Sequence, residues 1–237
     1  MIIELIYPRM CCLYGDKGNT LFLQKCFPDA KFVFTELNDK PYFIDNPVDL
    51  VCMYSLSEPN QEKALERLMP LKEECKNAFE NSITQFLFLG NSFELLGKYI
   101  ETEDGRKIDA LDVFDIYSVR HAPKRFNSLI RAKMQDMTLI GYTSRFSDTF
   151  GITEDIALCK NDVGLGSDAK SNLEGILTKN IIGTYLLGPL LPSNPNFAKW
   201  LLKRLGIENP TLPHEDVLYT CYETKLNEYN ITDLELN

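Results

Sequence analysis

Short apolar runs alternate with amphipathic segments through the first hundred residues, and few folds are compatible with that order. Two of the runs, Asp49–Tyr54 (DLVCMY) and Thr84–Leu89 (TQFLFL), are almost continuously apolar, as strands covered on both faces are. The expected strands are Met1–Tyr7, Lys31–Thr35, Asp49–Tyr54 and Thr84–Leu89, and the expected helices are Leu21–Cys26, Glu58–Phe79 (split near Pro70) and Asn91–Tyr99. This order predicts an α/β fold with an open, largely parallel, doubly wound sheet and flanking helices.

The pattern changes after Leu111, where short strand-like runs follow one another with little helix between them. These runs are Val113–Arg120, Leu129–Met134, Thr138–Thr143, Ile156–Lys160, Gly175–Leu177 and Ile181–Leu186. Helices are expected again at Asn196–Leu205 and at about Glu215–Tyr229. No internal repeat or Gly/Ser linker interrupts the chain, so we predict one α/β domain over residues 1–206.

Residues 207–237 form a predicted acidic, partly helical C-terminal extension. The segment holds seven acidic residues and one basic residue, and so carries six of the nine net negative charges of the chain. A solvated helical face is the expected role of such a charge run, and docking of a basic partner is the alternative.

Composition excludes several classes of function. A formal net charge of −9 disfavours nucleic-acid binding. No apolar run reaches the ~18 residues of a membrane span, and the first residues do not resemble a signal peptide. Seven cysteines in a chain of 237 residues fit reduced thiols in a cytoplasmic protein better than a disulfide framework. The two histidines, His121 and His214, lack metal-ligand spacing, so neither a metal nor another cofactor is expected.

The junction after Thr84–Leu89 is the place where chemistry is expected. Ligands bind at the carboxyl ends of strands in doubly wound folds, and a nucleophile on a strand–turn–helix junction is exposed. Here the turn is Gly90-Asn91-Ser92. Ser92 is the only side chain of this turn able to act as a nucleophile, and a hydrogen-bonding role at the helix start is its simpler interpretation. Glu94 is expected to be an exposed carboxylate in the first helical turn.

Three segments together resemble the glutamine amidotransferase subunit of bacterial lipid II isoglutaminyl synthase, a relative of the cobyric acid synthase amidotransferase domains. They are YPRMCCLYGDKGN (Tyr7–Asn19), GNSFELLGKYI (Gly90–Ile100) and NIIGTYLLGPLLPSNPNFAKWLL (Asn180–Leu202). The resemblance covers essentially the whole chain and implies a class I glutamine amidotransferase, flavodoxin-like fold. It also implies attack of a cysteine thiolate on glutamine, with a histidine as proton carrier. The ammonia then passes to a Mur-ligase-like partner that amidates the peptidoglycan stem peptide.

The chain departs from this family at its catalytic positions. Gly90 stands where the family has its nucleophilic cysteine, and Leu187 stands where it has its histidine. Neither side chain can take part in covalent or acid–base chemistry. The glycine-rich oxyanion turn is replaced by Tyr54-Ser55-Leu56-Ser57-Glu58, whose side chains obstruct close backbone approach. Arg125 aligns with an arginine that the family uses near glutamine.

These departures predict a catalytically degenerate, non-catalytic subunit or regulator that binds a Mur-ligase-like or other protein partner in peptidoglycan precursor amidation. One alternative is an active amidohydrolase with a relocated nucleophile, either Ser92 or Cys52. Another is a small-molecule binding module that uses the old pocket. The residues expected to line that pocket are Tyr54, Glu58, Asn91, Ser92, Arg125 and Ser147.

Overall fold

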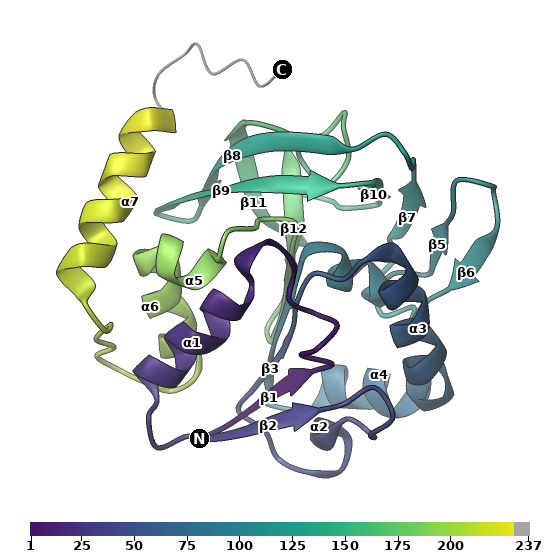
Figure 1. Ribbon diagram of the computed structural model, residues 1–237, viewed down its shortest axis with the longest axis horizontal. Coiled ribbons are helices and arrows are strands. Elements are labelled where there is room, and N and C mark those ends of the chain that lie inside the picture. Colours follow the sequence, from purple (N-terminus) through teal and green to yellow (C-terminus); the bar gives the residue numbers. More distant parts are fainter. Residues whose placement is uncertain (230–237) are drawn as a thin grey trace.

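A computed structural model describes residues 1–229, and its centre is a nine-stranded sheet with helices on both faces (Figure 1). The strand order is β2-β1-β3-β4-β13-β12-β11-β8-β9. The strands of this sheet are β1 (Ile2–Ile6), β2 (Lys31–Thr35), β3 (Leu50–Met53), β4 (Gln85–Leu89), β8 (Phe126–Met134), β9 (Met137–Arg145), β11 (Ala157–Val163), β12 (Leu173–Leu177) and β13 (Ile181–Thr184). Pairing is parallel from β2 to β13 and antiparallel from β13 to β9.

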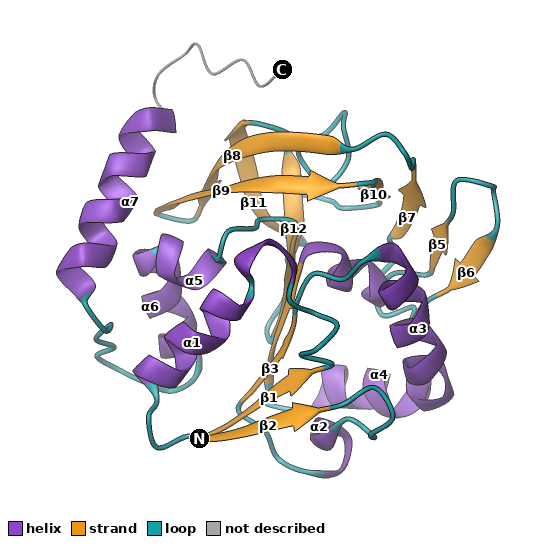
Figure 2. Cartoon of the chain, in the orientation of Figure 1, coloured by secondary structure: helices purple, strands orange, loops and turns teal. Residues whose placement is uncertain are grey.

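The helices form two layers (Figure 2). On one side lie α1 (Lys17–Cys26), α5 (Leu190–Ser193) and α6 (Pro195–Arg204), with α7 (Glu215–Tyr229) outside them. On the other side lie α2 (Tyr42–Asp45), α3 (Glu58–Leu68) and α4 (Lys72–Asn81). The short 3-10 helix η2 (Met69–Leu71) separates α3 from α4 at Pro70, where a proline ring is tolerated at a helix start. The predicted α/β class is therefore confirmed.

The central strands carry most of the core, as their apolar runs predict. All residues of β3, β4 and β13 are buried. Four aromatic rings pack edge-on or stacked between the sheet and the helices that cover it. They are Phe43 of α2, Phe79 of α4, and Phe86 and Phe88 of β4. This packing fixes the register of β4, and with it the position of the turn that follows.

A second, four-stranded sheet in the order β10-β7-β5-β6 lies beside the first. Its strands are β5 (Tyr99–Glu101), β6 (Lys107–Asp109), β7 (Tyr117–Arg120) and β10 (Ser147–Phe150). The predicted helix Asn91–Tyr99 is wrong here, because Gly90–Leu96 forms a 3-10 helix (η3) and the chain enters β5 at Tyr99. The predicted strand Val113–Arg120 is shorter in the structure, where only β7 is extended. The residues before β7 wrap around η3 instead, and their backbone N–H groups donate hydrogen bonds to the carbonyl oxygens of Leu95 and Leu96.

The C-terminal extension contributes a 15-residue helix, α7, that packs against α5 and α6. Tyr222 is its one buried residue and donates a hydrogen bond of 2.8 Å to Thr138 O on β9. Asp233 and Glu235, two acids of the predicted extension, lie outside the described residues. Within residues 1–229, no helix is long and apolar enough to cross a membrane.

Candidate functional site

The parallel strands end at one edge of the large sheet, and the turn after β4 lies there. Gly90 opens η3 with a φ of 61°, in the left-handed region that favours glycine. An ideal β-carbon on Gly90 would lie 2.8 Å from Ser55 Cβ and closer still to the Ser55 hydroxyl. Real β-carbons do not approach other atoms so closely, so Ser55 fills the space that a side chain at position 90 would need.

Leu187 faces the same space from the loop after β13. Its side chain is buried, and its backbone N–H donates a hydrogen bond of 2.9 Å to Tyr142 O on β9. Leu187 and Gly90 both line one cavity, together with Ser55, which we call the elbow cavity. The two positions aligned with the family's cysteine and histidine therefore meet in three dimensions, and neither offers a titratable group.

The elbow cavity is almost closed. Its volume is about 20 Å³, which holds roughly one water molecule. Cavities that bind drug-sized ligands have volumes of about 300–1,000 Å³. The predicted small-molecule use of this pocket therefore finds no support in its size, since a glutamine side chain has no room to enter.

The predicted lining residues divide into two groups. Glu58, Asn91 and Ser147 line the elbow cavity, whereas Tyr54 and Arg125 do not. Tyr54 points instead toward α1, where its hydroxyl accepts a hydrogen bond of 3.4 Å from Thr20 Oγ1. The exposed Arg125 sits beyond the rim and donates hydrogen bonds of 2.6 Å to the Tyr14 hydroxyl and 3.1 Å to Ser144 Oγ.

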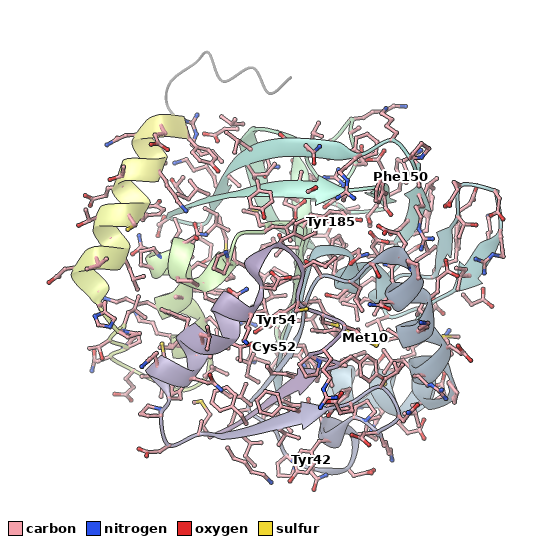
Figure 3. The ribbon with its side chains drawn as sticks, viewed as in Figure 1. Met10, Tyr42, Cys52, Tyr54, Phe150 and Tyr185 are labelled. Carbon is pink, nitrogen blue, oxygen red and sulfur yellow. The ribbon has the colours of Figure 1, made fainter. Side chains whose placement is uncertain are left out.

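The two alternative nucleophiles lie in poor positions for catalysis. Ser92 is fully buried, and its hydroxyl donates to the carbonyl oxygens of Leu89 and Met53, at 2.8 and 2.9 Å. Cys52 lies inside β3 beside Tyr54 (Figure 3), and burial raises the pKa of its thiol to about 12. A reactive cysteine needs the opposite shift. Neither residue lines the elbow cavity.

Glu94 is buried, which corrects the expectation of an exposed carboxylate. Its side chain accepts hydrogen bonds of 2.6 Å from the Tyr185 hydroxyl and 2.9 Å from Gln61 Nε2. Burial raises the pKa of Glu94, and the hydrogen bonds from Tyr185 and Gln61 oppose this shift. Sequence reasoning missed this residue because η3 is a 3-10 helix, which turns position 94 inward where the expected α-helix would expose it.

Arg145 is the second residue that the sequence did not indicate. It is buried at the end of β9, and its guanidinium lies 4.6 Å from the centre of the Tyr185 ring. The guanidinium also donates hydrogen bonds of 2.7 Å to the carbonyl oxygens of Ser147 and Gly166. The elbow cavity is thus walled by a buried cation, a buried acid and a tyrosine between them, all held by hydrogen bonds.

Asp16 lies behind Ser55, within the matched segment Tyr7–Asn19. Its Oδ2 accepts a hydrogen bond of 3.0 Å from the Ser55 backbone N–H. Burial raises the pKa of Asp16 to about 6, and the hydrogen bonds from Ser55 oppose the shift. Within residues 1–229, no group of three or more His, Cys, Asp or Glu side chains could hold a metal ion.

Comparison with known proteins identifies the family of this chain. A model of the CobB/CobQ-like glutamine amidotransferase domain matches residues 2–195. The GatD subunit of a glutamine-hydrolyzing lipid II isoglutaminyl synthase from Staphylococcus aureus is 26% identical over 208 residues, which covers 86% of this chain and 83% of the relative. The subunit of the same name from Streptococcus pneumoniae is 27% identical over 227 residues, covering 91% and 86%.

Solved structures agree on the fold. A glutamine amidotransferase crystal structure superposes with a TM-score of 0.56 at 10% identity, covering 87% of this chain and 100% of the other. A second, from Thermotoga maritima, gives a TM-score of 0.53 at 10% identity, covering 98% and 92%. The resemblance inferred from the three sequence segments is confirmed, and the chain belongs to the CobB/CobQ-like glutamine amidotransferase family.

Proposed function

We propose that this chain is a catalytically degenerate glutamine amidotransferase that serves as a non-catalytic subunit or regulator in the amidation of peptidoglycan precursors. It would act in the cytoplasm, bound to a Mur-ligase-like protein. The relatives named above are subunits of a glutamine-hydrolyzing lipid II isoglutaminyl synthase, and this supports the pathway. All seven cysteines are free thiols.

One observation carries the proposal: Gly90 and Leu187 face the same closed cavity, and Ser55 occupies the space of the missing side chain. Glutamine hydrolysis through a covalent intermediate needs a nucleophile and a base within hydrogen-bond reach of it. It also needs room for the substrate. The positions expected to hold the family's cysteine and histidine supply neither group, and the cavity has room for roughly one water molecule. Its buried polar groups Glu94, Tyr185 and Arg145 are engaged with one another or with the backbone.

Retention of the scaffold supports a binding role. The segments LYGDKGN and GPLLPSNP match the family while the catalytic positions differ. In the structure these segments contact each other, because Asn19 Oδ1 accepts a hydrogen bond of 2.9 Å from the Leu191 N–H and α1 packs on α5. A chain that keeps this packing but lacks the family's nucleophile fits a subunit that is retained because it binds a partner protein.

The test is ammonia release from glutamine by the purified chain, alone and mixed with the Mur-ligase-like protein of the same organism. The Staphylococcus aureus GatD subunit with its own ligase serves as the active control. We expect no ammonia release above background from the chain alone or from the mixture, and we expect the chain to co-elute with its partner on size exclusion. Release that survives both Ser92→Ala and Cys52→Ala, or absence of any complex, would contradict the proposal.

Activity abolished by Ser92→Ala or by Cys52→Ala would instead favour a relocated nucleophile. The structure offers this second candidate little support, because both side chains are buried away from the elbow cavity.

A further inference from the structure

A second and much larger cavity lies on the other side of Leu187. It is open to solvent and is bordered by the β8–β9 hairpin, the loop after β13, α5 and the last turns of α7, and we call it the α7 cavity. Its volume is about 400 Å³, which falls in the range of ligand-binding pockets. Leu129, Tyr142 and Tyr229 line it and are half-buried, whereas Ile140 and Leu187, which also line it, are only 1–2% exposed.

Two tyrosines hold α7 over β9 and so keep this cavity bounded. The Tyr222 hydroxyl donates a hydrogen bond of 2.8 Å to Thr138 O, and the Tyr229 hydroxyl donates one to Gly141 O. Both acceptors are backbone carbonyls of the edge strand β9. Tyr229 lines the cavity, whereas Tyr222 fastens the helix to the strand outside the lining.

The rim of the α7 cavity carries charge of both signs. Lys225 and Glu228 project from α7, three residues apart. Among residues 1–229, the Lys225 ammonium forms no ion pair within 4 Å, so it remains able to meet a ligand anion. Glu228 on the same rim would oppose a second negative group close to it.

We propose that the α7 cavity binds a small molecule with an apolar body and one anionic group. The body packs against Leu129 and the half-buried rings of Tyr142 and Tyr229, whose exposed apolar surface is then removed from water. The anionic group stays at the rim beside Lys225, where it keeps most of its hydration. This inference is independent of the proposed function, because it uses neither glutamine nor the partner protein.

Two fluorescent probes of the same shape test the proposal on the full chain. They are 1-anilinonaphthalene-8-sulfonate, which is anionic, and N-phenyl-1-naphthylamine, which lacks the sulfonate. We expect saturable binding of each probe at one site. Lys225→Gln should weaken the anionic probe about two- to five-fold, as loss of an exposed ion pair does, and leave the neutral probe unchanged. Glu228→Gln should strengthen the anionic probe alone.

Filling the cavity should abolish both signals. Leu129 is half-buried in β8 and lines the cavity, so Leu129→Trp places a bulky indole ring there. We expect at least a ten-fold loss of affinity for both probes. Leu177→Trp is the matched control, since Leu177 is a half-buried leucine of β12 outside the cavity. Ser193→Leu fills the cavity from α5 and serves as a second variant if Leu129→Trp unfolds, as judged by circular dichroism.

The proposal fails if the full chain shows no saturable binding of either probe. It also fails if both filling variants are folded and bind the probes as the full chain does. Binding of the two probes that responds identically to Lys225→Gln would overturn the assignment of the anionic group to the rim.

Discussion

The Tyr185 hydroxyl donates a hydrogen bond of 2.6 Å to Glu94 Oε1, and this contact joins the end of β13 to η3 beneath the elbow cavity. Both side chains are buried, with 1% of each residue exposed. The same hydroxyl lies 2.7 Å from Thr149 Oγ1 on the second sheet. One phenol therefore links the two sheets to the turn that opens η3.

Tyr185→Phe should lower the free energy of unfolding by about 1–3 kcal/mol, because it leaves a buried carboxylate short of one donor. Urea denaturation of the two chains measures the difference. Tyr117→Phe is the control, since the Tyr117 ring is held by stacking between Tyr99 and Phe150, and it should change stability by less than about 0.5 kcal/mol. Equal effects of the two variants would show that the contact with Glu94 contributes nothing.

Gly90→Cys should destabilise the fold without restoring glutamine hydrolysis. The left-handed backbone costs about 1–3 kcal/mol for a side chain, and the overlap with Ser55 adds about 1–3 kcal/mol. We expect a total loss of about 2–6 kcal/mol in the free energy of unfolding, measured by urea denaturation.

The double variant Gly90→Cys with Ser55→Gly should recover the part of this loss that comes from overlap, so the two changes will not be additive. If the double variant instead lost the sum of the stability losses of the two single variants, Ser55 would not obstruct the side chain at position 90. Ammonia release by the double variant, with Leu187 unchanged, would show that the missing base is not limiting.

Asp16→Asn should change how stability depends on pH. The pKa of Asp16 is about 6 in the folded chain and about 3.9 for an unfolded aspartate, so the folded state binds its proton more tightly. The contribution of Asp16 to stability is therefore largest below about pH 4 and is lost as the pH rises toward about 6.

The stability of Asp16→Asn relative to the parent chain should accordingly rise between pH 4 and pH 6 by up to about 3 kcal/mol, and stay level above that. Urea denaturation at several pH values checks this. Asp29→Asn, at an exposed position, is the matched control for loss of one negative charge. A constant difference between Asp16→Asn and the parent chain across this range would contradict burial as the cause of the shift.

A chain ended at Gly206 should still unfold cooperatively, because both sheets and the helices that cover the parallel strands precede that residue. Its free energy of unfolding should be lower by several kcal/mol, because burying each large apolar side chain contributes about 1.5–3 kcal/mol. Among residues 207–229, Leu212 and Tyr222 are the buried ones that the shortened chain lacks. Failure of this chain to give a cooperative transition would mean that residues 207–237 are part of the domain rather than an extension of it.

The sequence predicted the parallel part of the sheet with accuracy. β1 to β4 lie within one or two residues of the expected positions. β3 and β4 are fully buried, as their continuous apolar runs predict for strands covered on both faces, whereas β2 is an edge strand with Phe34 exposed. The prediction failed at residues 91–99, where a helix was expected and the chain forms η3 and β5. The helical pattern there is real, but contacts with the second sheet, far along the chain, decide the local geometry.

Residue identity alone determined what positions 90 and 187 lack, since glycine and leucine have no group to ionise whatever surrounds them. Only the tertiary structure decided that the two positions meet, that Ser55 fills the gap between them, and that Glu94 and Arg145 are buried beside Tyr185. Those outcomes depend on distances between segments about thirty to a hundred residues apart. Such distances are set by how the strands and their connections pack, and not by any pattern within one segment.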